Sequence, residues 1–179
     1  MPRNNWKQSE KLLEGVRFDV YRVGYPRRDG GVNHREVVVP ADAVVILPWL
    51  DEHTLVLIRN ERPSVGETLW ELPAGTLEEG EDPGECAERE LAEETGYRPG
   101  QVERMTEFYT TPGFCTEKMF AYRATGLEHV GQDLDATEHI EVEKVTPGEA
   151  LKMIADGRIR DGKTIAVLLL DLQQPEGKC

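Results

Sequence analysis

Apolar and polar residues alternate along the early part of the chain, as they do in half-buried β-strands. Residues 16–23, "VRFDVYRV", and residues 34–39, "HREVVV", follow this pattern, and "RRDGGVN" between them has the composition of a hairpin turn. Two more apolar runs, "DAVVILPWL" at 42–50 and "TLVLIRNE" at 54–61, predict strands joined by "DEH". The first third of the chain is therefore predicted to be built of strands.

Strands and helices mix in the remainder of the chain. Residues 66–75, "GETLWELPAG", are predicted to be short and extended, and the patterns at 101–111 and 117–128 predict further strands. The patterns at 146–157 and 163–174 predict helices. Because no regular βαβ repeat is present, this order favours an α/β fold with a mixed sheet flanked by helices over a doubly wound parallel fold.

Another helix is predicted between Asp82 and Gly96. Asp82 is a suitable N-cap, Pro83 then takes the first helical position, and Glu85 completes a capping-box arrangement. Gly96 is a good terminator. The second half of this helix carries Glu90, Glu93 and Glu94.

The stretch "RELAEETG" at 89–96 places three carboxylates within five residues, in a chain of formal net charge -13. On a helix Glu90 and Glu94 share a face, where like charges cost roughly 0.2–0.5 kcal/mol per pair, while Glu93 lies to one side. Mg²⁺ and Mn²⁺ prefer oxygen ligands, and Mg²⁺ also binds substrate phosphates. We therefore expect divalent cations to relieve the repulsion, with a simply solvated acidic face as the alternative.

The charge and composition of the chain argue against some classes of binding partner. The pI of about 4.8 argues against nucleic acid or an anionic membrane as the main partner. The apolar runs are too short to cross a bilayer, and the first fifteen residues lack the apolar centre of a signal peptide. Three cysteines without metal-ligand spacing, Cys86, Cys115 and Cys179, indicate a reduced, cytoplasmic protein.

From Gly75 the chain follows a fixed pattern. Gly75 is followed by five residues, Glu81, seven residues, and then "RELAEETGY" at 89–97. This resembles a complete Nudix box. The resemblance implies a Nudix α/β/α sandwich and a metal-dependent hydrolase of nucleoside diphosphates linked to another group.

The resemblance also implies roles for the residues of the box. Glu90 and Glu94 are expected to be the principal metal ligands, joined by the backbone carbonyl of Ala74. Glu93 is expected to bind a second metal or to orient water, and Arg89 to orient a carboxylate. Structural or supporting roles at the site fall to Gly75, Glu81 and Gly96.

Upstream of the box, "IRNERPSVGETLWELPAG" resembles the branch that hydrolyses ADP-ribose and nucleotide sugars. Arg59 and Arg62 are candidates for phosphate or ribose contacts, with solvated strand-end arginines as the alternative. Glu71 is a candidate substrate-side or metal-side carboxylate, or it caps the turn before the box. Residues 61–63 are "ERP" where the branch usually carries an aromatic residue and a second basic one, which keeps other substrates open.

Downstream, "YTTPGFCTEKMF" resembles the marker of members that prefer ADP-ribose. Pro112 and Glu117 carry this marker, although Pro-Gly is also an ordinary turn. The region from 131 to 164 resembles the end of the same branch, where a loop glutamate reaches the metals as a base. Glu138 matches this position best, and Glu141 is the alternative.

The N-terminal part, residues 1–40, resembles the small antiparallel β extension of this branch, which takes part in homodimer contacts, and residues 41–179 match the hydrolase domain. We therefore expect a homodimeric, Mg²⁺- or Mn²⁺-dependent enzyme that hydrolyses ADP-ribose or a related sugar nucleotide to AMP and a sugar phosphate. GDP-mannose, another sugar nucleotide or a dinucleoside polyphosphate remain alternative substrates. A sensor that binds nucleotide sugars without turnover is the alternative of another class.

Overall fold

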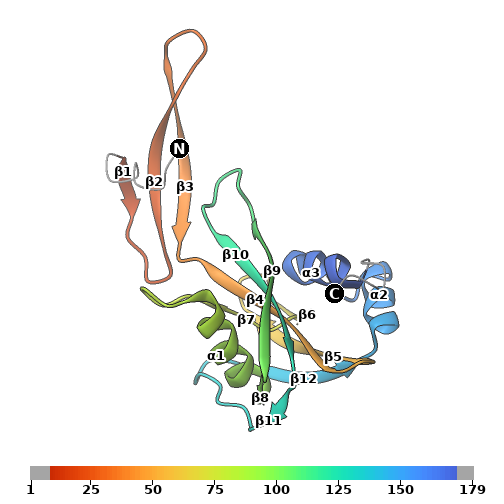
Figure 1. The fold of residues 1–179 in the computed structure, drawn as a ribbon. Coiled ribbons are helices and arrows are strands. Elements are labelled where there is room, and N and C mark those ends of the chain that lie inside the picture. Colours follow the sequence, from red (N-terminus) through yellow and green to blue (C-terminus); the bar gives the residue numbers. More distant parts are fainter. Residues whose placement is uncertain (1–8, 173–179) are drawn as a thin grey trace. The chain divides into compact units, whose positions relative to one another are not determined.

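The computed structural model in Figure 1 describes residues 9–172, so Cys179 lies outside it. The described residues fall into two compact units. The first contains residues 9–42 and 108–119, and the second contains residues 43–107 and 120–172. The sequence predicted a boundary after residue 40, and the structure also groups 108–119 with the N-terminal unit.

The first unit is a three-stranded antiparallel sheet. Its order is β1 (Glu10–Leu13), β2 (Phe18–Pro26) and β3 (Val32–Pro40). Arg27 N donates to the carbonyl of Gly31 at 2.7 Å, which closes the predicted hairpin turn. Residues 108–119 reach the sheet at Val38, whose N–H donates to the carbonyl of Phe114 at 2.8 Å. The predicted small β extension is confirmed.

The second unit combines helices with a larger sheet, although residues 108–109 and 118–119 of its strands are grouped with the first unit. Within residues 9–172, seven strands follow the order β12-β5-β4-β10-β9, with β6 paired to β5 and β7 paired to β4. These strands are β4 (Ala43–Asp51), β5 (Thr54–Arg62), β6 (Glu67–Glu71), β7 (Ala74–Thr76), β9 (Gln101–Tyr109), β10 (Lys118–Thr125) and β12 (Ile140–Val145). A two-stranded sheet pairs β8 (Tyr97–Arg98) with β11 (Glu128–His129). The helices are α1 (Pro83–Thr95), α2 (Pro147–Ala155) and α3 (Gly162–Leu172).

Strand β4 is buried on both faces: six consecutive residues from Ala43 are buried, and successive side chains of a strand point to opposite sides. Val44 and Ile46 pack in one cluster with Leu91 of α1 and Tyr122 of β10. A fully buried Leu side chain contributes on the order of 1.5–3 kcal/mol. Helix α1 therefore covers one face of β4.

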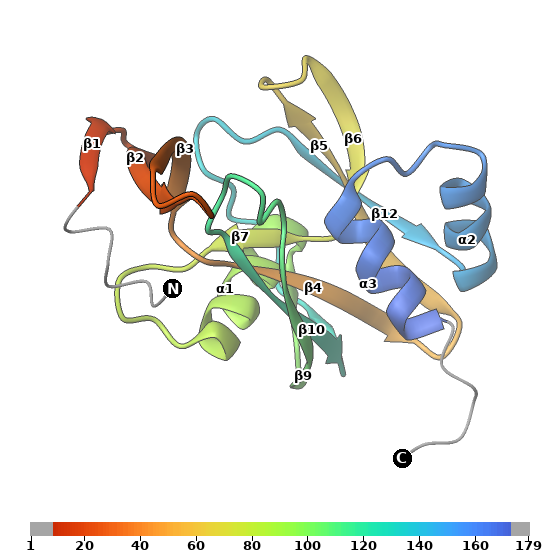
Figure 2. The same cartoon turned by 90° about the horizontal axis from the view of Figure 1, so that it is seen from above.

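Helix α3 packs on the other face of β4. The indole Nε1 of Trp49 donates to Asp171 of α3 at 3.2 Å, and Leu72 N donates to Thr164 Oγ1 at 2.8 Å. Figure 2 shows α1 and α3 on opposite sides of β4. The predicted mixed α/β sandwich is confirmed. No helix among the described residues is long and apolar enough to cross a membrane.

Gly96 is required where the chain leaves α1. Its φ is 73°, and a Cβ added there would lie 2.8 Å from Gln132 N. We predict that Gly96→Ala lowers the free energy of unfolding by about 1–3 kcal/mol, because the left-handed backbone and the contact both disfavour a side chain. Urea denaturation measures this. Gly148→Ala is the control, since a Cβ at Gly148 has nothing within 4 Å. Equal stability of Gly96→Ala and wild type would contradict the prediction.

Candidate active site

Helix α1 is fixed at both ends, which sets the direction of its carboxylates. Asp82 is the N-cap, and its Oδ1 accepts from Gly84 N at 2.8 Å. The predicted cap is confirmed, but its bond goes to Gly84 instead of the amide of Glu85. At the other end Gly96 N donates to the carbonyl of Ala92 at 2.9 Å.

Glu94 is buried, with 3% of its surface exposed. Its Oε2 accepts from Ala74 N at 2.9 Å. Burial raises the pKa of Glu94 to about 8, and the negative charges of Glu90 and Glu138 add to this rise. A cation bound at Glu94 offsets both effects, so this carboxylate is suited to a metal ion.

Glu90 lies against the backbone of Gly75. A Cβ built on Gly75 would be 1.8 Å from Glu90 Cδ, so only glycine leaves room for this carboxylate. Burial raises the pKa of Glu90, while the adjacent Arg89 opposes the rise. The predicted structural role of Gly75 therefore has a steric cause.

Arg89 connects three carboxylates. Its Nε and Nη2 donate to Glu81 Oε1 and Oε2 at 2.9 and 3.1 Å, in a bidentate pair. Its Nη1 donates to Glu90 Oε1 at 2.8 Å and to Glu93 Oε2 at 3.0 Å. The bonds from Arg89 hold the pKa of Glu81 down to about 2. This geometry supports an orienting role for Arg89 and a supporting role for Glu81.

Glu71 is held by two cations of the same unit. Arg62 donates from Nε and Nη2 to Oε1 and Oε2 of Glu71 at 2.8 and 2.7 Å, and Lys163 Nζ donates to Oε2 at 2.5 Å. Burial raises the pKa of Glu71, but the bonds with Arg62 and Lys163 bring it below its usual value. Because both oxygens are engaged, this arrangement favours an ordering role for Glu71. Sequence reasoning missed Lys163, although it lies in the "DGKT" stretch at 161–164.

The loop before β12 is tied to the end of α1. Gln132 Nε2 donates to the carbonyl of Glu94 at 2.7 Å, and Asp133 N donates to the carbonyl of Glu93 at 3.1 Å. The same loop carries Glu138, whose charge contributes to the raised pKa of Glu94. The structure therefore brings Glu138 into the electrostatic neighbourhood of the box carboxylates. Nothing in the sequence pattern singled out Gln132.

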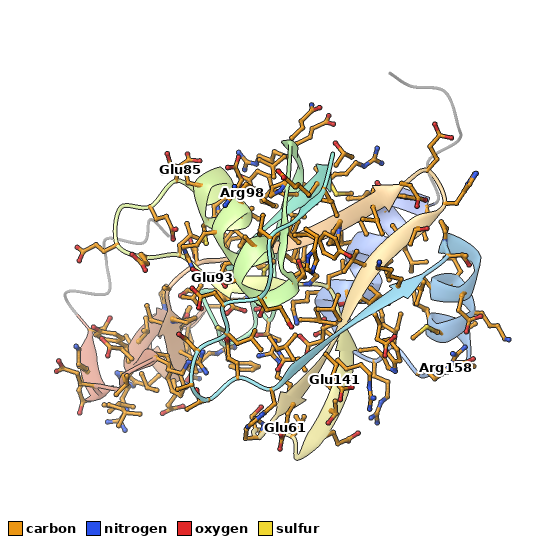
Figure 3. The ribbon with its side chains drawn as sticks, turned by 90° about the horizontal axis from the view of Figure 1, so that it is seen from below. Glu61, Glu85, Glu93, Arg98, Glu141 and Arg158 are labelled. Atoms are coloured by element: carbon orange, nitrogen blue, oxygen red, sulfur yellow. The ribbon has the colours of Figure 1, made fainter. Side chains whose placement is uncertain are left out.

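A hollow of about 370 Å³ lies beside this loop, with Arg59, Glu138 and Glu141 among its lining residues. Arg59 Nη1 donates to Glu141 Oε2 at 3.0 Å, and its guanidinium lies 5.7 Å from the ring centroid of Trp70. Figure 3 shows Glu93 on α1 and Glu141 on β12. Because Glu141 is paired with Arg59, Glu138 is the better placed of the two candidate bases.

Two predicted substrate contacts lie in the first unit. Pro112 is exposed and Glu117 is half-buried, and both belong to the segment that joins β3. Their assignment to the substrate stays a prediction.

Cys86 and Cys115 are free thiols, as expected.

The oxygen atoms near the end of α1 fit a divalent cation. Within residues 9–172 no three His, Cys, Asp or Glu side chains already form a metal cluster, and Arg89 bonds to both Glu90 and Glu93. The donor set nevertheless suits Mg²⁺ or Mn²⁺, because Glu90 and Glu94 are hard oxygen ligands whose charges are disfavoured without a cation. The carbonyl of Ala74 and the half-exposed Glu93 are further oxygen donors.

We predict that Gly75→Ala abolishes stabilisation by Mg²⁺ while changing stability without metal by less than about 1 kcal/mol. Glu90 has a flexible side chain that can move away from the new methyl group, and this would displace the expected metal ligand. Thermal unfolding with and without Mg²⁺ measures both effects, with Gly148→Ala as the control. A normal response of Gly75→Ala to Mg²⁺ would show that Glu90 is not a ligand.

We further predict that Glu94→Gln stabilises the protein in a chelator, and that the gain grows with pH. An unfolded glutamate titrates near about 4.3, whereas the folded pKa of Glu94 is about 8. Between these values the folded state keeps a proton that the unfolded state has lost, so wild-type stability falls as pH rises. Glutamine has no such proton.

Thermal unfolding in EDTA between about pH 5 and pH 8 tests this linkage. Glu88→Gln, at an exposed position of the same helix, is the matched control. A difference between Glu94→Gln and wild type that does not change with pH would disprove the role of Glu94 burial.

The sequence of the chain is similar to those of known proteins of one family. The family model described as "NUDIX domain" matches residues 39–168. The chain is 35% identical over 168 residues to an "ADP-ribose pyrophosphatase" of Bacillus subtilis (strain 168), covering 92% of this chain and 91% of that protein. It is 38% identical over 172 residues to a "Methanol dehydrogenase activator" of Bacillus methanolicus, covering 93% and 92%. It is 34% identical over 174 residues to a "GDP-mannose pyrophosphatase" of Escherichia coli O1:K1 / APEC, covering 89% and 90%.

A solved structure supports the fold assignment. The structure titled "Crystal structure of ADP compounds hydrolase" has a TM-score of 0.81 at 23% identity, covering 90% of this chain and 88% of that chain. The expected Nudix fold is thus confirmed. The chain belongs to the Nudix family of hydrolases.

Proposed function

We propose that this Nudix pyrophosphatase hydrolyses the diphosphate bond of ADP-ribose to AMP and ribose 5-phosphate, with Mg²⁺ or Mn²⁺ as cofactor. The observation that carries the proposal is the pair Glu90 and Glu94, packed against Gly75 and Ala74 with raised pKa values. The choice of substrate rests on the similarity to an ADP-ribose pyrophosphatase and on the marker around Pro112.

Different residues would bind the cation and orient its carboxylate ligands. Glu90, Glu94 and the carbonyl of Ala74 would hold the cation, which when bound neutralises phosphate charge and lowers the pKa of water. Arg89 holds Glu90 and Glu93 in place through its bonds to both. These residues let a protein of net charge -13 bind a substrate that is itself negative.

Residues outside the Nudix box are the candidates for proton transfer and for phosphate binding. Glu138 is the proposed base, because its loop is tied to α1 and its charge acts on Glu94, and Glu93 is the alternative. Arg62 is the proposed diphosphate contact. Its side chain is 35% exposed, while Glu71 holds its guanidinium by two hydrogen bonds.

GDP-mannose is the second candidate substrate. The chain is nearly as similar to a GDP-mannose pyrophosphatase as to the ADP-ribose pyrophosphatase. The hollow lined by Arg59, Thr68 and Glu138 is a candidate site for the sugar or base of either substrate. The two substrates are therefore to be compared directly.

We also propose that the protein acts as a homodimer through its N-terminal unit. Several apolar side chains of this unit are exposed in the single chain: Leu13 (50%), Phe18 (44%) and Val32 (58%). Singly exposed apolar side chains are normal on a protein surface, so the proposal rests on the resemblance of residues 1–40 to the β extension that takes part in homodimer contacts.

We predict metal-dependent release of AMP and ribose 5-phosphate from ADP-ribose, with kcat/KM at least about tenfold above that for GDP-mannose. Chromatographic product analysis with Mg²⁺ or with EDTA measures this. The folded Glu94→Gln variant serves as the control and is expected to lose nearly all turnover, because the principal carboxylate ligand is gone. Preference for GDP-mannose would overturn the substrate assignment. Normal turnover by Glu94→Gln would overturn the metal-ligand assignment.

A further inference from the structure

The first residues of α3 bind two consecutive residues of the segment that leads into the active site. Lys163 Nζ donates to Glu71 Oε2 at 2.5 Å, and the next residue, Thr164, accepts from Leu72 N at 2.8 Å. Asp161 fixes this end of the helix, because its Oδ2 accepts from both the N–H and the Oγ1 of Thr164 at 3.0 and 2.6 Å. The contact is therefore built from α3 and not from a free surface side chain.

The bond from Lys163 reaches Arg62 through Glu71. One oxygen of Glu71, Oε2, accepts from both Lys163 Nζ and Arg62 Nη2, while Oε1 accepts from Arg62 Nε. Glu71 is only 1% exposed, so it has little water to replace a lost partner. Lys163 is itself only 13% exposed and is also paired with Asp161 at 3.0 Å. Lys163 therefore fixes the carboxylate that orients the guanidinium of Arg62.

Arg62 and Glu94 are held by the same short segment, because Glu71 binds the guanidinium of Arg62 and the N–H of Ala74, three residues further on, donates to Glu94 Oε2 at 2.9 Å. Its bonds to Glu71 use Nε and Nη2, so the donors of Nη1 are not spent on Glu71. An arginine held in this way near the proposed metal-binding carboxylates would suit a bidentate contact with the diphosphate of the substrate.

We infer that Lys163 is a positioning residue for the diphosphate of the substrate, acting through Glu71 to hold the guanidinium of Arg62 beside Glu94. This inference rests on the proposed function. It assigns a role to the "DGKT" stretch at 161–164, which lies outside the Nudix box. Lys163 touches no reacting atom.

The test measures affinity as well as turnover. The probe is α,β-methylene-ADP with Mg²⁺, a diphosphate whose bridging carbon resists hydrolysis, titrated by calorimetry. Lys163→Met keeps the length of the side chain and removes its donors, and we expect its Kd to rise about tenfold, whereas Lys163→Arg stays within about threefold of wild type. Lys152→Met is the matched control, because Lys152 is 71% exposed on α2, and we expect no change in its Kd.

A double-mutant cycle separates positioning from a general effect on the fold. If Lys163 acts through Arg62, Lys163→Met has no further effect on Kd once Arg62→Gln is present. Melting temperatures of the four proteins in the cycle record any loss of stability separately. A purely structural role of Lys163 would weaken binding by the same factor in both backgrounds.

The inference is overturned by unchanged affinity in Lys163→Met, by failure of Lys163→Arg to restore binding, or by additive losses in the cycle. Absence of binding to the wild-type protein also contradicts it. Failure of the proposed function would be observed differently. The wild-type protein would then leave ADP-ribose intact, while the Kd values for α,β-methylene-ADP would still show whether Lys163 acts through Arg62.

Discussion

The site depends on the packing of two carboxylates against a short turn. Glu90 fits only because residue 75 has no side chain, and Glu94 enters the buried layer because the N–H of Ala74 meets it there. Both groups are less stable as anions than an exposed glutamate. The fold thus disfavours the charged forms of both carboxylates, and a cation bound to them would relieve this penalty.

The surrounding elements keep the two carboxylates in this position. The caps of α1 fix the helix, and Arg89 joins Glu81 to the carboxylates of the helix end. On the other side, Thr164 of α3 binds the backbone at Leu72, two residues before Ala74. The turn from 71 to 75 is therefore held between α1 and α3. Buried polar contacts of this kind would keep the proposed metal ligands in a fixed geometry.

Local signals made much of this fold predictable. Asp82 and Gly96 mark the ends of α1, and the glycine-containing stretch at 27–33 marks the hairpin turn, since caps and turns depend on residues close in sequence. Long-range contacts were not predictable. Lys163 and Glu71 are 92 residues apart, and no periodicity links them. The grouping of 108–119 with the N-terminal unit depends likewise on tertiary hydrogen bonds to Val38.

Direct measurement of Mn²⁺ binding tests the central claim, which is that Glu90 and Glu94 form a cation site because their charges are buried together. Electron paramagnetic resonance of free Mn²⁺ during titration gives the affinity of wild type and of Glu94→Gln, with Glu88→Gln as the exposed control on the same helix. We predict that Glu94→Gln weakens Mn²⁺ binding at least about tenfold and that Glu88→Gln leaves it unchanged. Equal affinity of wild type and Glu94→Gln would contradict it.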